Sequence, residues 1–109
     1  MIKTKDAMKI IRRMVGDDPE LREWIAVEAM NADVARMIYH ARVQAGLTQK
    51  ELARLVGTTQ SVVARLEDAD YRGHSLTMLN RIAAALDKRL EIRMVGAGRR
   101  RRAKVRQGS

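Results

Sequence analysis

The chain has 109 residues, of which 46% are hydrophobic, enough for one compact domain with short extensions and too many for a wholly disordered protein. It contains no cysteine, which excludes disulfide frameworks, thiolate zinc sites and cysteine nucleophiles. The net charge is +9, but six of the 22 basic residues and none of the 13 acidic residues lie in residues 99–109, so most of the excess belongs to the C-terminus.

Residue usage predicts an all-α protein. Phenylalanine is absent and aromatic residues make up only 3% of the chain, whereas alanine, leucine, methionine, arginine and glutamate are abundant. No apolar run approaches the roughly 20 residues of a membrane span, and the N-terminus lacks the apolar core of a signal peptide. We therefore expect a cytoplasmic protein with no membrane segment.

The N-terminal part of the chain predicts helices. Residues 6–15 form a short amphipathic stretch, and Asp18 followed by Pro19 is typical of a helix start. Apolar residues then recur at steps of three and four up to Gly46, which has the residue type and position typical of the C′ residue that follows a helix. Asn31 predicts a break around residues 30–33.

A short helix, a tight turn and a second short helix follow. Thr48 and Glu51 have the spacing of a capping box, and this helix should end at about Val56. Gly57 supplies a residue that tolerates positive φ in the turn, and Thr58 is expected to start the second helix.

The C-terminal part should hold one more helix and one strand. Residues 68–74 are a polar loop, Ser75 can cap a helix that ends near Leu86, and residues 89–95 alternate with a period of two. A single strand cannot provide hydrogen-bond partners for its own backbone N–H and C=O groups. We therefore expect this strand to pair with that of a second chain in a dimer, with three apolar residues as candidate dimer contacts: Leu90, Ile92 and Met94.

The second short helix has side chains that suit DNA. If Val62, Val63 and Leu66 are buried, the opposite face carries polar and small residues: Thr59, Gln60, Ser61, Ala64 and Arg65. Glutamine pairs with adenine and arginine with guanine, while serine pairs with either. Free N–H groups at the helix starts, Thr48 and Thr58–Thr59, can contact phosphates. A helix-turn-helix binds DNA with these features, because its second helix enters the major groove.

Residues 34–86 resemble the lambda-repressor/Cro-type DNA-binding domains of the Xre family. The similarity rests on the spacing of one set of residues: Thr48, Gln49, Leu52, Ala53, Gly57, Gln60, Ser61, Val63, Leu66 and Glu67. The resemblance implies a lambda-repressor-like domain of about five helices. It also implies that Gln49 contacts phosphate, that Gln60, Ser61 and Arg65 contact bases, and that Thr59 contacts either.

A longer pattern is similar to HigA-like antitoxins of type II toxin–antitoxin systems. It adds the segment from Tyr71 to Leu76, the following helix and the Leu-Glu-Ile-Arg strand at residues 90–93 to the helix-turn-helix. The resemblance implies a homodimer that represses its own operon at a palindromic operator and binds a small RelE-like ribonuclease toxin. Candidate toxin contacts lie in the N-terminal region: Leu21, Trp24 and Ile25.

The expected organisation has three parts: an N-terminal helical extension (residues 1–33), a DNA-binding and dimerisation domain (34–95) and a basic flexible tail (96–109). Arg72 and His74 could either stabilise the turn or contact DNA phosphates. Trp24 could either bind a partner protein or pack within its own domain. The basic tail, Arg99 to Arg106, is either a solubility segment or a phosphate contact.

Two other functions are compatible with the same residues. The chain could be a stand-alone Xre-type repressor without a toxin, or an adaptor that kept the fold and lost DNA binding. No nucleophile elbow, phosphate loop or metal-ligand cluster is present in the sequence, so we expect no enzymatic activity, metal or cofactor.

Overall fold

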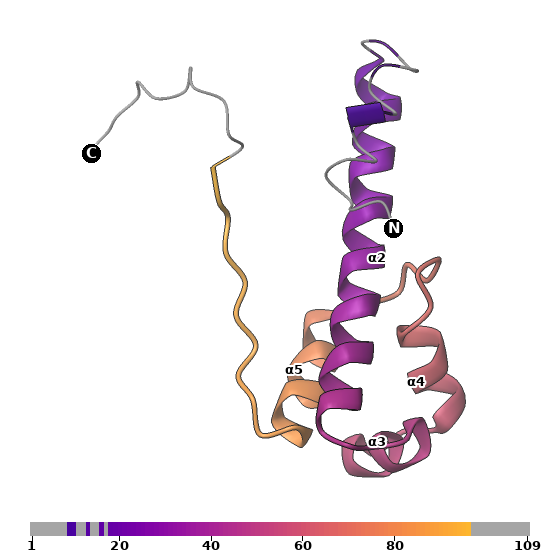
Figure 1. Cartoon of the computed structure of the whole chain (residues 1–109), viewed down its shortest axis with the longest axis vertical. Coiled ribbons are helices and arrows are strands. Elements are labelled where there is room, and N and C mark those ends of the chain that lie inside the picture. Colours follow the sequence, from indigo (N-terminus) through magenta and orange to yellow (C-terminus); the bar gives the residue numbers. More distant parts are fainter. Residues whose placement is uncertain (1–8, 11–12, 14–15, 17, 97–109) are drawn as a thin grey trace, which may run out of the picture.

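The structure is a computed structural model that describes residues 9–10, 13, 16 and 18–96 (Figure 1). This part of the chain contains four numbered helices: α2 (Pro19–Gln44), α3 (Gln49–Val56), α4 (Gln60–Leu66) and α5 (Leu76–Ala85). They confirm the all-α class. Most of the predicted stretch over residues 6–15 and of the basic tail, including Arg99 to Arg106, lies outside the described residues.

Helix α2 is continuous over 26 residues, so the predicted break around residues 30–33 is wrong. Asp18 caps the helix by accepting a hydrogen bond from the Leu21 N–H at 3.2 Å. The helix contains no glycine, and its single proline lies at the start, where it is tolerated. One asparagine costs at most about 0.7 kcal/mol relative to alanine, too little to end such a helix. Helix α2 therefore crosses the predicted boundary between residues 33 and 34.

The C-terminal half of α2 is the half that contributes buried side chains, namely Ala35 and Ile38. In Figure 1 the three short helices gather around this half, while the N-terminal half extends beyond them. Every numbered helix contributes to the main cluster: Ile38, Leu52, Ala53, Val63, Leu66, Leu79 and Ile82. Helices α3 and α4 are therefore fixed against one end of a long rod.

The turn between α3 and α4 confirms most of the sequence prediction. Thr48 and Glu51 form a capping box, Gly46 has φ +74° just after the C-cap of α2, and Gly57 has φ +86° at the end of α3. The predicted helix start at Thr58 is wrong by two residues, because the Thr58 N–H completes α3 by donating to the Ala53 carbonyl at 2.9 Å. Thr59 is the N-cap of α4 instead.

Helix α5 begins after Ser75, whose hydroxyl accepts a hydrogen bond from the Met78 N–H at 3.1 Å, as predicted. Residues 88–96 take no regular secondary structure and lead away from the helices in Figure 1. Residues 18–96 hold no second strand with which residues 89–95 could pair, so the strand remains a prediction that requires a second chain. No helix in the described residues combines the length and the apolar character needed to cross a bilayer.

The capping box predicts a pH dependence of stability. The Glu51 carboxylate accepts a hydrogen bond from the Thr48 N–H at 2.8 Å, which lowers the pKa of Glu51 below its ordinary value of 4.5. A lowered folded-state pKa contributes stability that is present above the ordinary pKa and is lost as the pH falls through the folded one.

We expect Glu51→Gln to lose less thermal stability than the wild type when the pH falls from about 5 to about 3. Glutamine can still accept the capping hydrogen bond, so the helix should form. Thermal midpoints from circular dichroism measure the effect, and Glu23→Gln is the control for removing one surface carboxylate. Parallel midpoint curves for Glu51→Gln and wild type would contradict the assignment.

Candidate nucleic-acid interface

Helix α4 has one buried side and one exposed side. Val63 and Leu66 are buried, Val62 is half-buried, and the remaining residues of the helix are exposed: Gln60, Ser61, Ala64 and Arg65. Residues at these positions share one side of a helix with a period of 3.6. Within the described residues, no hydrogen bond or ion pair engages the side chains of Gln60, Ser61 or Arg65. Their donors and acceptors are therefore available to base edges.

An ion pair whose side chains are largely buried fixes the two ends of this helical pair to α2. The Arg42 guanidinium donates to both Glu67 carboxylate oxygens, from Nε at 2.6 Å and from Nη2 at 3.0 Å, and from Nη1 to the Leu47 carbonyl at 2.8 Å. The two side chains are only 11% and 5% exposed. The hydrogen bond to Glu67 raises the pKa of Arg42 above its already high ordinary value. This bidentate geometry joins the end of α2 to the residue that ends α4.

Gln49 belongs to the same network. Its Nε2 donates to Glu67 Oε1 at 3.1 Å, and its side chain is partly exposed at the start of α3. An amide nitrogen has two N–H donors, so one donor remains for a phosphate while the other holds the side chain in place. The predicted phosphate role of Gln49 is compatible with this position and stays a prediction.

The predicted threonine contacts lie at the two helix starts. The hydroxyl of Thr48 accepts from the Glu51 N–H at 3.0 Å, and the hydroxyl of Thr59 accepts from the Val62 N–H at 3.3 Å. Each hydroxyl keeps its own proton for donation to a phosphate. Thr58 is half-buried, and its backbone N–H already serves α3, so that group is not free for DNA.

Arg72 and His74 have partners within the protein. The Arg72 guanidinium forms an ion pair with Glu28 at 2.5 Å and lies over the Trp24 ring, 5.6 Å from its centroid. His74 Nε2 lies 2.7 Å from the Leu66 carbonyl oxygen, to which it must donate, and the ring meets Tyr71 edge-on at 5.1 Å between centroids. These contacts hold His74 within the loop and tie the loop to α2 through Arg72, while Nδ1 of His74 is buried without a hydrogen-bond partner among the described residues. Phosphate contact by Arg72 or His74 stays a prediction.

The other predicted contacts differ in exposure. Among the candidate toxin contacts, Leu21 is 36% and Trp24 is 52% exposed, whereas Ile25 is half-buried. Among the candidate dimer contacts, Ile92 and Met94 are 63% and 101% exposed, whereas Leu90 packs partly against the core.

Sequence reasoning missed the roles of Arg42 and Glu28. The pair between Arg42 and Glu67 spans 25 residues, and no short motif marks a contact at that separation. Arg42 is nevertheless a charged residue on the same helical side as buried Ala35 and Ile38, a signal that it needs a buried partner. The described residues contain no group of three or more side chains suited to holding a metal ion.

Residues 38–92 match a helix-turn-helix family model, slightly more than half of the chain. The chain belongs to the helix-turn-helix family. The matched type is that of Xre and lambda-repressor proteins, so this helix-turn-helix protein is a DNA-binding regulator of transcription. Searches of curated proteins and of solved structures found no match.

The buried pair yields a stability prediction for this helix-turn-helix protein. Removing one partner leaves the other charge buried and unpaired, which typically costs about 3–5 kcal/mol. We expect Glu67→Ala to lower the free energy of unfolding by about that amount and to weaken DNA binding by releasing Gln49.

The matched control is Arg36→Ala, which removes an arginine from the exposed pair with Asp33, where both side chains are about half exposed. Exposed pairs contribute about 0–1 kcal/mol. Urea unfolding of the two variants measures the difference, and equal losses of stability would refute a dominant role for the buried pair.

Proposed function

We propose that this helix-turn-helix protein is an autorepressor that binds a palindromic operator as a homodimer and also neutralises a small ribonuclease toxin. The observation that carries the repressor part is the exposed side of α4, where Gln60, Ser61 and Arg65 have no partner within the described residues. The ion pair behind α4 holds that side in a fixed orientation. Major-groove recognition by the second helix of a helix-turn-helix requires this combination.

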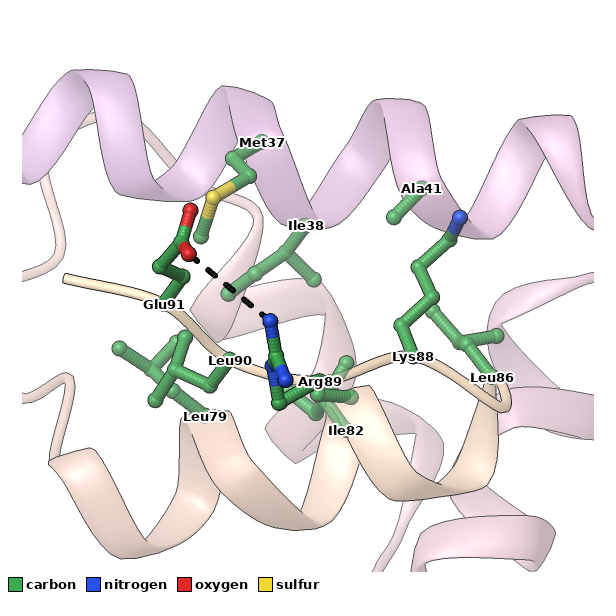
Figure 2. A pocket seen from close by; sticks show the side chains of 11 residues that line it. Met37, Ile38, Ala41, Leu79, Ile82, Leu86, Lys88, Arg89, Leu90 and Glu91 are labelled. Atoms are coloured by element: carbon green, nitrogen blue, oxygen red, sulfur yellow. Dashed lines mark ion pairs between the residues drawn. The ribbon is translucent and has the colours of Figure 1, made fainter.

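A groove beside α5 supports the dimer. It has a volume of about 240 Å³ and lies between α2, α5 and the segment after α5. Figure 2 shows Met37 and Ala41 above it, Leu79 and Ile82 below, and Arg89 and Glu91 at its rim, where the two form an ion pair at 3.9 Å. Ile92 and Met94 are exposed on the same segment. A second copy would pair its residues 89–95 with this segment and bury these apolar groups together.

The N-terminal half of α2 supports the toxin interaction. Besides Leu21 and Trp24, Val27 and Met30 are 48% and 63% exposed. Residues 18–33 contain five acidic residues and one basic residue, whereas residues 34–96 contain ten basic and six acidic residues. An acidic helix with exposed apolar side chains complements a basic, RNA-binding protein better than it complements DNA. A stand-alone repressor would have less need of this exposed surface.

Base selection tests the repressor part. We expect Arg65→Ala to lose preference at one base pair per half-site, because each good base contact contributes about 1–3 kcal/mol of discrimination. Selection of bound duplexes from a random pool measures the preference at every position, and half-sites should lie about 34–36 Å apart. Arg81→Ala, on exposed α5 surface, is the charge-matched control.

Removal of residues 99–109 should lower affinity for specific and random duplexes alike and flatten the salt dependence. If Arg65→Ala has this same uniform effect, then Arg65 contacts phosphate and the assignment of base recognition is wrong.

Rescue of growth tests the toxin part. A chain that begins at Ala32 keeps Ile38 and Arg42 and should still bind DNA, but it should fail to rescue cells that express the small protein of the adjacent reading frame. Trp24→Ala should weaken the rescue, and Val43→Ala, an exposed apolar residue at the other end of α2, should not. Full rescue by the shortened chain would leave the stand-alone repressor as the function, and absence of any DNA binding at low salt would favour the adaptor.

A further inference from the structure

The loop between α4 and α5 brings one basic side chain to the N-terminal half of α2. Arg72 lies five residues after Glu67, the C-cap of α4, and its guanidinium is held by two groups on α2: the Glu28 carboxylate and the Trp24 ring. Trp24 and Glu28 are four residues apart, so they lie on one side of the helix and form a seat for a planar cation. The seat is occupied by the chain's own arginine.

The loop that carries Arg72 continues from the end of α4, so this arginine should lie near the DNA backbone when α4 lies in a major groove. Helix α4 has seven residues and is therefore about 10 Å long, while the major groove of B-DNA is about 12 Å wide. Segments that continue from the ends of a helix placed in that groove border the flanking phosphates. The side chain of Arg72 is 57% exposed, so it is accessible from solvent even while it is seated.

A phosphate and Glu28 compete for this guanidinium. The Glu28 side chain is 24% exposed, and at 2.5 Å its carboxylate neutralises much of the positive charge that Arg72 could offer. The carboxylate also repels an approaching phosphate directly.

We propose that Trp24 and Glu28 are positioning residues that hold Arg72 away from the DNA backbone, so that occupation of the N-terminal half of α2 and DNA affinity are coupled through Arg72. A partner that covers Trp24 and supplies its own basic side chain to Glu28 releases Arg72, which then adds one phosphate contact. The inference rests on DNA binding through α4, and it makes the N-terminal half of α2 a regulator of that binding.

The test uses the full chain and a mixed-sequence duplex, because phosphate contacts do not depend on sequence. We expect Glu28→Gln to bind more tightly than wild type and to steepen the dependence of log affinity on log salt by about 0.9, the value for one additional phosphate contact. This slope corresponds to about threefold more affinity lost between about 50 and about 200 mM salt. Glu23→Gln removes the same charge from α2 at another position and should leave the slope unchanged.

A second substitution separates release of Arg72 from a change in net charge. Arg72→Gln should have little effect on the salt slope in the wild type, where the arginine is seated, and should abolish the added slope in Glu28→Gln. The proposal is overturned if Arg72→Gln lowers the slope equally in both backgrounds, or if Glu28→Gln and Glu23→Gln behave alike. A wild type that binds no duplex at low salt would instead overturn DNA binding itself.

Fluorescence reports directly whether Arg72 lies on the Trp24 ring, because Trp24 is the only tryptophan of the chain. A saturating duplex should change the Trp24 emission of Glu28→Gln as Arg72 leaves the ring, and should leave that of the wild type, where Arg72 stays on the ring, unchanged. The same emission in Glu28→Gln with and without saturating duplex would overturn the proposal.

Discussion

The orientation of the exposed side of α4 depends on the ion pair between Arg42 and Glu67. Short helices such as α3 and α4 bury few side chains each, so apolar contacts alone leave their angle to α2 weakly determined. The guanidinium links the C-terminal end of α2, the Leu47 carbonyl before α3 and the residue that ends α4. Gln49 joins the same carboxylate from the start of α3. The favoured geometry of a bidentate pair thus fixes the orientation of the exposed side of α4.

This pair contributes more to geometry than to net stability. Burial of two charges carries a large desolvation penalty, which their attraction and hydrogen bonds offset only when every donor and acceptor is satisfied. Here three N–H groups of Arg42, one on each nitrogen, have an acceptor and both Glu67 oxygens accept, which offsets part of the penalty while the pair links the three helix ends.

The two halves of helix α2 differ in their surroundings: the C-terminal half packs in the core, and the N-terminal half is largely exposed. At about 1.5 Å per residue its 26 residues extend about 39 Å, and only the C-terminal half takes part in the core. The N-terminal half is acidic and partly apolar, and the loop after α4 touches it through Arg72. A ligand on that half therefore acts on an element that is continuous with the DNA-binding domain.

The sequence by itself determined the local features of the fold. The capping box at Thr48 and Glu51, the left-handed Gly57 and the caps at Asp18 and Ser75 depend on residues within a few positions of one another, so pattern alone identified them. The exposed side of α4 also followed from a helical period. The predicted break near Asn31 was wrong because the weak local preference of one asparagine is smaller than the cooperative stability of a long helix.

Only the tertiary structure decided the contacts between distant residues. The pairing of Arg42 with Glu67 and the seating of Arg72 on Trp24 and Glu28 join side chains 25 or more residues apart, and their partners depend on how the helices pack. Judged by charge alone, many acidic residues of the chain could pair with Arg42 or with Arg72. Packing brings one carboxylate to each guanidinium, and this is why the network behind α4 and the link to α2 became visible only in the folded chain.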